Sequence, residues 1–295
     1  MDILLSGQLL LATLVLGSVY ALVAMGLNLI YGTMRLLNVA HGELVMIGAY
    51  VAFWAFTWAN ISPLISLFAA MALTAGLGWA TYRFLVRGML ASGQVMQRIE
   101  ANSLLIFFGL SIILQNLVSL AFTANERAYA YLDQVVRFGD ISIGADRLVI
   151  LAISLAVSLA AILFFRYSMT GLAMRALIEQ REAAALVGIE RDRVSQLVFV
   201  LGFALAGLAG ALISMTEQIS PFSGFPFTIA AFVVIILGGL GNLYGGLIGA
   251  FLLAAIEVYG VALTSSAYRS ILVYGVFIAV LLWRPQGLLG GKRLS

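Results

Sequence analysis

The sequence predicts an all-α protein that crosses a membrane about eight or nine times, with re-entrant or broken segments. Its composition is 63% hydrophobic and only 10% charged, and its mean hydropathy is +1.08. Soluble domains are about 45–50% apolar and about 25% charged. Apolar segments recur from one end of the chain to the other, and none shows the two-residue alternation of a membrane β-barrel strand. A surface this apolar requires lipid as its main solvent.

Nine segments are apolar enough to cross about 30 Å of hydrocarbon, which takes roughly 20 residues of helix. They are residues 7–31, 37–58, 63–85, 104–122, 148–165, 194–215, 227–240, 245–263 and 271–283. Backbone in lipid must satisfy its own hydrogen bonds, so we expect helices. Segment 227–240 is short and flanked by glycines, which favours a half-helix or a re-entrant element. We expect one membrane domain over residues 1–295.

The positions of lysine and arginine predict an orientation. With nine spans and loop 166–193 in the cytoplasm, 12 of the 16 basic residues fall on the cytoplasmic side. The other four, on the outer side, are Arg127, Arg137, Arg147 and Arg269. This asymmetry follows the positive-inside rule and places the N-terminus outside and the C-terminus in the cytoplasm. The sequence contains no cysteine, which excludes disulfides and thiolate metal sites.

Two loops have structure of their own. The outer loop 123–147 is polar and contains short β-prone runs at 135–138 and 141–143 around Gly139, which predict a small hairpin. The inner loop 166–193 contains a pattern over 171–189 that predicts one short amphipathic helix ending at Gly188. Such a helix beneath a membrane either lies on lipid headgroups or docks into a groove on a cytoplasmic partner, and its pattern leaves both open.

The residues of this predicted helix resemble a known sequence motif. Glu182-Ala183-Ala184, three residues and then Gly188 are similar to the coupling motif of ATP-binding cassette (ABC) importer permeases. The resemblance implies that the helix docks on a cytoplasmic ATPase and transmits its closure. The residues that would couple the chain to the ATPase are Arg175, Glu179, Glu182, Ala183, Ala184 and Gly188.

Further motifs narrow the resemblance to one subfamily. The run from Asn38 to Glu43, Asn-Val-Ala-His-Gly-Glu, resembles a signature of branched-chain amino acid permeases of the LivH type. Residues 17–22, 166–168, 230–232, 238–242 and 284–287 are similar to that family in the same order. The resemblance implies a bacterial inner-membrane permease subunit for leucine, isoleucine and valine. It also implies three kinds of partner: a second homologous permease, two cytoplasmic ATP-binding subunits and a periplasmic substrate-binding protein.

Polar side chains within the spans are expensive in lipid and are therefore candidates for function. We expect these to line or gate the translocation path: Asn38, His41, Glu43, Gly241, Asn242 and Glu257. A structural role remains open, because His41 and Glu43 can also cap a broken helix and Glu257 can also bond a partner within the bundle. The chain has a single histidine, so we expect no histidine-based metal site. We also expect no cofactor, no catalytic residue and no nucleic-acid partner, and contact with membrane lipid.

Other functions remain alternatives. Related permeases are associated with urea or short amides, which are the alternative substrates for the same type of transporter. An independent secondary transporter would share the interrupted spans but would not need a coupling helix. An intramembrane enzyme would need a nucleophile beside His41, and no serine is placed for it. The sequence has no phosphate-binding loop, so ATP hydrolysis is expected on partner subunits.

Overall fold

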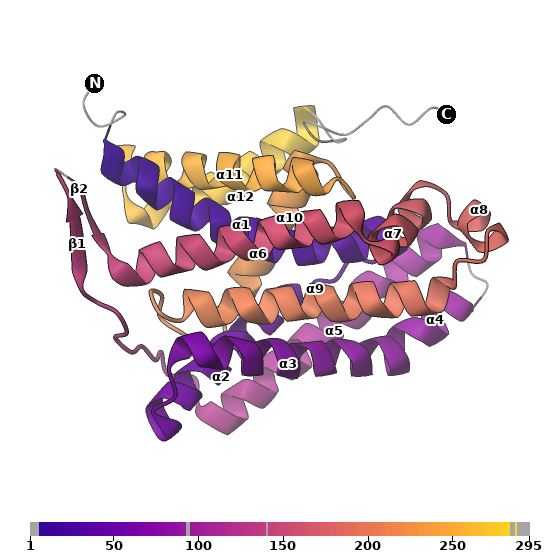
Figure 1. Cartoon of the computed structure of the whole chain (residues 1–295), viewed down its shortest axis with the longest axis horizontal. Helices are drawn as coiled ribbons and strands as arrows, with labels where there is room; N and C mark the ends of the chain where they lie inside the picture. Colours follow the sequence, from indigo (N-terminus) through magenta and orange to yellow (C-terminus); the bar gives the residue numbers. More distant parts are fainter. Residues whose placement is uncertain (1–5, 93–94, 140, 284–286, 288–295) are drawn as a thin grey trace.

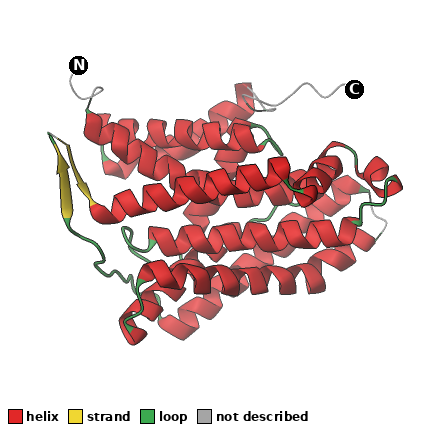
Figure 2. Cartoon of the chain, viewed as in Figure 1, coloured by secondary structure: helices red, strands yellow, loops and turns green. Residues whose placement is uncertain are grey.

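The computed structural model describes residues 6–92, 95–139, 141–283 and 287, and it is an all-α bundle (Figures 1 and 2). Seven of the described helices are long and apolar enough to cross a membrane. They are α1 (Gly7–Met34), α2 (His41–Ala59), the continuous helix α3–η1–α4 (Pro63–Thr81, Tyr82–Val86, Arg87–Ala91), α5 (Met96–Phe122), α6 (Ala145–Tyr167), α9 (Arg191–Ile213) and α11 (Leu243–Leu263). Two shorter apolar helices, α10 (Gly224–Gly238) and α12 (Arg269–Trp283), complete the bundle. The prediction of a polytopic α-helical membrane protein is confirmed.

Two predicted spans begin four or more residues away from the helix start in the structure. The span expected over 37–58 begins at His41, because α1 ends at Met34 and residues 35–40 form no helix. The span expected over 104–122 begins at Met96. Its first turns carry polar residues that lower hydropathy without disfavouring a helix. Glu100 in these turns accepts a hydrogen bond of 2.9 Å from the Tyr31 hydroxyl of α1.

Helix α9 lies at the centre of the bundle, where it packs against α1, α2 and α3. Of its most apolar stretch, 78% is buried, compared with 11% for α5 at the periphery. Glycines allow the close packing: a Cβ on Gly48 of α2 would collide with the backbone of Gly207 in α9. Small residues at such crossings bring helix backbones together where lipid supplies no hydrophobic drive.

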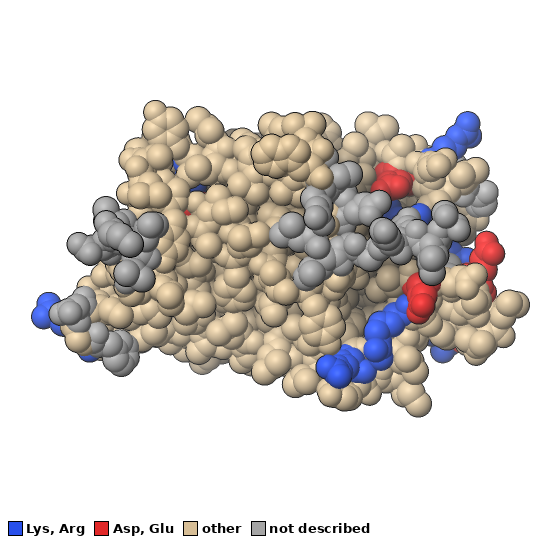
Figure 3. Space-filling model, turned by 90° about the horizontal axis from the view of Figure 1, so that it is seen from above, with Lys and Arg blue, Asp and Glu red and all other residues tan. Residues whose placement is uncertain are grey.

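The two ends of the bundle differ. At one end lies the antiparallel hairpin of β1 (Val135–Phe138) and β2 (Ile141–Gly144), which confirms the hairpin predicted in the outer loop (Figure 1). At the other end lie α4, α7 (Met169–Glu179) and α8 (Arg181–Leu186). On the face shown in Figure 3, charged side chains gather mainly toward the α7–α8 end, and a wide uncharged area separates them from the hairpin end. Arg284, Lys292 and Arg293, assigned above to the cytoplasmic side, lie outside the described residues.

The loop before the hairpin is fixed to the bundle. Arg127 pairs with Ile219 through two backbone hydrogen bonds of 2.8 Å. Its guanidinium carbon lies 4.8 Å from the ring centroid of Trp54 in α2, a cation–π contact. The Tyr129 hydroxyl lies 2.8 Å from that of Ser214, and burial raises the pKa of Tyr129 to about 12. Tyr129 therefore stays protonated at neutral pH and keeps this hydrogen bond.

Candidate functional site

The chain leaves helical geometry inside the bundle at two places, here called breaks, and the first comprises residues 35–40 before α2. Residues 35–40 turn back along α1, so that α2 begins beside the middle of that helix rather than at its end. The free N–H groups at a helix start need partners. Thr228 of α10 supplies one: its hydroxyl accepts from the Gly42 amide at 2.8 Å and donates to the Val39 carbonyl at 3.0 Å. Leu37 donates its amide to the Ser103 hydroxyl of α5 at 3.0 Å.

The polar residues predicted at this position are fully buried. The exposed fractions of Asn38, His41 and Glu43 are all 0%. The Nε2 of His41 donates to the Val23 carbonyl at 3.0 Å, and the Oε1 of Glu43 accepts from the Ser111 hydroxyl at 2.9 Å. Both side-chain atoms of Asn38, Nδ1 of His41 and Oε2 of Glu43 find no hydrogen-bond partner among the described residues. Buried polar atoms without partners are uncommon in proteins.

Glu43 also lies where two helices start. A Cβ on Gly224, the first residue of α10, would come within 2.5 Å of Oε2 of Glu43. The carboxylate belongs to the first turn of α2 as well. A negative charge is favoured at a helix N-terminus, because the exposed N–H groups give that end a partial positive charge. The Glu43 carboxylate therefore lies near the N-termini of both α2 and α10.

The second break lies between α10 and α11. Gly239 and Gly241 have φ angles of +98° and +84°, which favour glycine. The Asn28 side chain of α1 holds this turn: its Oδ1 accepts from the Gly241 amide at 2.7 Å, and its Nδ2 donates to the Asn242 carbonyl at 2.8 Å. Asn242 in turn caps α11, because its Oδ1 accepts from the Gly245 amide at 3.0 Å.

Helix α10 connects these two breaks. Its first turns contact the start of α2, which hydrogen-bonds to Val23 of α1, and the turn that follows it contacts Asn28 of the same helix. Five residues of helix cover only about 7.5 Å, whereas the 15 residues of α10 extend about 22 Å. The helix must therefore run at a steep angle to α1, as it does in Figure 1.

Glu257, predicted to lie in the path, is part of a buried ion pair. Its side chain is 3% exposed, and its carboxylate accepts from the Tyr20 hydroxyl at 2.6 Å and from the Arg269 guanidinium. A second carboxylate, Glu217, lies 3.9 Å from Nη1 of Arg269. An isolated carboxylate would be expensive at this depth, so Arg269 and Tyr20 stabilise its charge.

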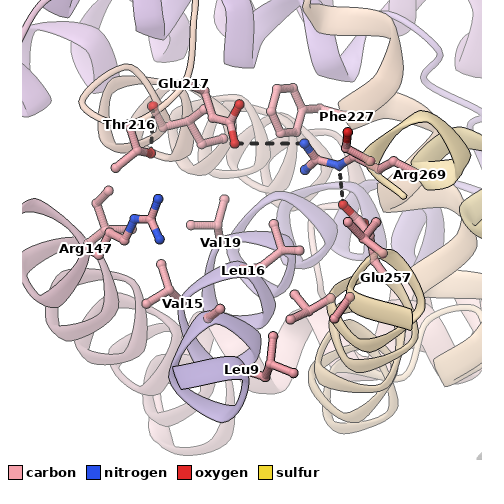
Figure 4. Close-up of a pocket in the computed structure, with 17 residues that line it drawn as sticks. Leu9, Val15, Leu16, Val19, Arg147, Thr216, Glu217, Phe227, Glu257 and Arg269 are labelled. Atoms are coloured by element: carbon pink, nitrogen blue, oxygen red, sulfur yellow. Dashed lines mark hydrogen bonds and ion pairs between the residues drawn. The ribbon is translucent and has the colours of Figure 1, made fainter. Parts of the chain in front are cut away.

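This ion pair lines a cavity of about 460 Å³ (Figure 4). The cavity lies between α1, α6, α11 and the start of α12, and its wall is mostly aliphatic. Its charged lining residues are Arg147, Glu217, Glu257 and Arg269. A second cavity of about 300 Å³ shares Glu217, Phe227 and Arg269 with the first. Of the six residues predicted for the path or gate, Glu257 alone is among the lining residues of these two cavities.

The inner loop differs from its prediction. The prediction of a single amphipathic helix over 171–189 is wrong, because the extended backbone of Gln180 (φ −153°) separates α7 from α8. Gly188 has a φ of +85° and lies in the turn after α8. The predicted coupling residues Arg175, Glu179, Glu182, Ala183 and Gly188 are exposed, and Ala184 is buried. Arg175 donates to the Arg166 carbonyl at 3.0 Å.

Comparison with known proteins decides the family. The model of the family described as "Branched-chain amino acid transport system / permease component" matches residues 9–281. The chain belongs to this permease family. The permease is 34% identical to BraD of Pseudomonas aeruginosa, a high-affinity branched-chain amino acid transport system permease protein, over 96% of this chain and 95% of BraD.

Two further relatives come from one bacterium, and one solved structure shares the fold. LivH of Escherichia coli is 34% identical over 93% of the permease and 92% of LivH. LivM of the same organism is 26% identical over 92% of the permease and 68% of LivM. The solved structure of PsaBC from Streptococcus pneumoniae in complex with Fab aligns with a TM-score of 0.51 at 14% identity, over 97% of the permease and 95% of that chain. This last likeness concerns the fold alone.

Sequence reasoning missed several residues that build these sites in the permease. Arg269 and Arg147 were assigned to outer loops, although both line the cavity. Thr228 was not singled out, and Tyr20 entered only as part of the family-like run 17–22, yet each bonds a residue distant in sequence. A cation is a common partner of a buried carboxylate, and Arg269 follows Glu257 by 12 residues, so this one partner was open to inference.

We predict that Arg269→Gln destabilises the permease by about 3 kcal/mol, because it leaves the Glu257 charge buried without a cation. The double variant Glu257→Gln/Arg269→Gln is expected to regain most of this loss, since no charge then remains unpaired. Thermal unfolding of the purified permease in detergent measures both, with Arg137→Gln on the exposed strand β1 as the control. A double variant no more stable than Arg269→Gln would contradict the ion-pair assignment.

Proposed function

We propose that the chain is the permease subunit of an ATP-driven importer for leucine, isoleucine and valine. The observation that carries the proposal is an apolar tip on the inner loop. Leu186 and Val187, at the end of α8, are 89% and 76% exposed, next to exposed Glu182 and Ala183. Apolar side chains projecting from a short helix among charged ones are typical of a surface that binds a groove on a protein partner. We assign that groove to a cytoplasmic ATPase.

The connections of α8 support a coupling role. Only the turn at Gly188 separates α8 from α9, the most buried of the long helices. At the start of α9, Asp192 accepts from the Tyr82 hydroxyl at 2.9 Å and pairs with Arg87 at 3.2 Å. A displacement of α8 would therefore reach both α9 and the α3–α4 helix. In this way the closure of an ATPase would move the centre of the bundle.

The family supports the substrate and the remaining partners. The names of BraD and LivH specify branched-chain amino acid transport. LivM of Escherichia coli carries the same description as a permease protein of that transport system. We propose a second homologous permease, two ATPases and a periplasmic substrate-binding protein as partners, within a bacterial inner membrane. The chain itself would hydrolyse nothing. The wide uncharged area on the face shown in Figure 3 would contact lipid.

The decisive experiment is uptake of labelled leucine into proteoliposomes that contain the assembled transporter, with and without ATP. We predict uptake that requires both ATP and the binding protein. The double variant Leu186→Ser/Val187→Ser is expected to weaken ATPase binding about 10-fold or more, because it removes two exposed apolar anchors. Leu186→Met/Val187→Ile, which keeps the apolar surface, serves as the matched control.

The other outcomes separate the alternatives. Uptake that persists without ATP and without ATPase subunits would favour a secondary transporter. ATP-driven uptake of urea or short amides in place of leucine would keep the mechanism and change the substrate. Serine variants that bind the ATPases as tightly as the control would contradict docking through α8.

We predict that the hairpin faces the outside and α8 faces the cytoplasm. The chain contains no cysteine, so single cysteines at exposed Ser142 of β2 and exposed Ala185 of α8 can report the side directly. A membrane-impermeant maleimide should label Ser142→Cys in intact cells and Ala185→Cys only after permeabilisation. The reverse labelling would contradict the orientation, which follows the positive-inside rule.

A further inference from the structure

The cavity of Figure 4 combines balanced charges with an aliphatic wall. Two arginines and two glutamates line it: Arg147, Arg269, Glu217 and Glu257. Their formal charges sum to zero, which suits an occupant with both a positive and a negative group and no net charge. Opposite charges fixed in a mostly aliphatic wall attract the two charged ends of such an occupant.

The four charged residues fall into two classes. Glu257 and Arg269 form a close pair, and Tyr20 donates a further hydrogen bond to Glu257. Glu217 and Arg147 form fewer or longer contacts within the protein. Glu217 is 53% exposed and its one ion-pair contact, to Arg269, is long at 3.9 Å. Arg147 is exposed and forms no ion pair within the described part of the chain. These two side chains therefore remain available to a ligand.

The two available charges lie on different elements around one apolar wall. In Figure 4 Arg147 comes from one side of the cavity and Glu217 from another, and Val15, Leu16 and Val19 of α1 form the wall beside them. The ion pair of Arg269 with Glu217 and Glu257 carries a net negative charge, which adds to the attraction for a cationic group on that side. The volume of about 460 Å³ is within the usual range of small-molecule sites.

We propose that this cavity binds the zwitterion of an aliphatic α-amino acid, a site that rests on the proposed importer function and gives it a place in the chain. The ammonium group lies at Glu217, the carboxylate lies at Arg147, and the branched side chain packs on Val15, Leu16 and Val19. Glu257 is a positioning residue, because it pairs with Arg269, whose guanidinium lies 3.9 Å from the Glu217 carboxylate. The cavity lies toward the hairpin end, beside the first half of α1, so it would receive substrate first.

The test is equilibrium binding of radiolabelled leucine to the assembled, nucleotide-free transporter in lipid nanodiscs, without the binding protein. Two competitors each lack one charged group: 3-methylbutylamine lacks the carboxylate, and 4-methylpentanoate lacks the ammonium. We expect each to compete about 10-fold or more weakly than leucine, since each leaves one charged side chain unpaired.

Two single variants assign the charges. Arg147→Gln should abolish the preference for leucine over 3-methylbutylamine while the preference over 4-methylpentanoate remains. Glu217→Gln should do the opposite. Arg137→Gln, an exposed arginine on strand β1 away from the cavity, should change neither. Because each readout is a ratio of affinities in one sample, it does not depend on how much of a variant folds.

The outcomes that overturn the site differ from those that overturn the function. ATP-driven leucine uptake with no leucine binding in nanodiscs would refute the site and leave the importer intact. Variants that weaken all three ligands equally would also refute it, as would a phospholipid found in the complex by native mass spectrometry that leucine does not displace. Absence of ATP-driven amino acid uptake by the wild-type transporter would refute the proposed function, and the site with it.

Discussion

The structure depends on one constraint: backbone groups that leave a helix inside a membrane protein must find partners within the protein. The chain leaves helical geometry twice beside α1, before α2 and before α11. Side chains from other helices meet the need in both places, Thr228 and Ser103 at the first break and Asn28 at the second. Helix α10 connects the breaks, so the packing of α1, α2, α10 and α11 forms one unit around these hydrogen bonds.

Hydropathy predicted the bundle well because lipid-facing and core positions are both apolar, so each span stands out along the sequence. The hairpin was equally accessible, since Gly139 lies between two β-prone runs. Hydropathy does not register where the backbone leaves helical geometry, and this caused the errors. Residues 37–40 are buried or half-buried and mostly apolar, yet they form no helix, because their path is set by hydrogen bonds to Ser103 and Thr228. Gln180 breaks the inner helix without any glycine or proline to signal it.

The polar residues predicted for the site divide by what surrounds them. Asn38, His41, Glu43, Gly241 and Asn242 lie at the two breaks, whereas Glu257 lies at a charged cavity whose other members sequence reasoning placed in loops. Pairing across the fold cannot be deduced from periodicity, because Tyr20 and Glu257 are 237 residues apart. The cavity and the inner loop occupy opposite ends of the bundle, and α1 and α9 connect them.

Hydrogen exchange followed by mass spectrometry, on the permease in lipid nanodiscs, tests the central constraint most directly. The account predicts slow exchange in peptides that cover 239–242 and 41–43. Asn28→Ala should accelerate exchange about 10-fold or more at 239–242 only, because the Gly241 amide loses its acceptor. Wild-type exchange at 239–242 as fast as in the outer loop 123–134, unchanged by Asn28→Ala, would contradict the claim that side chains hold the broken backbone.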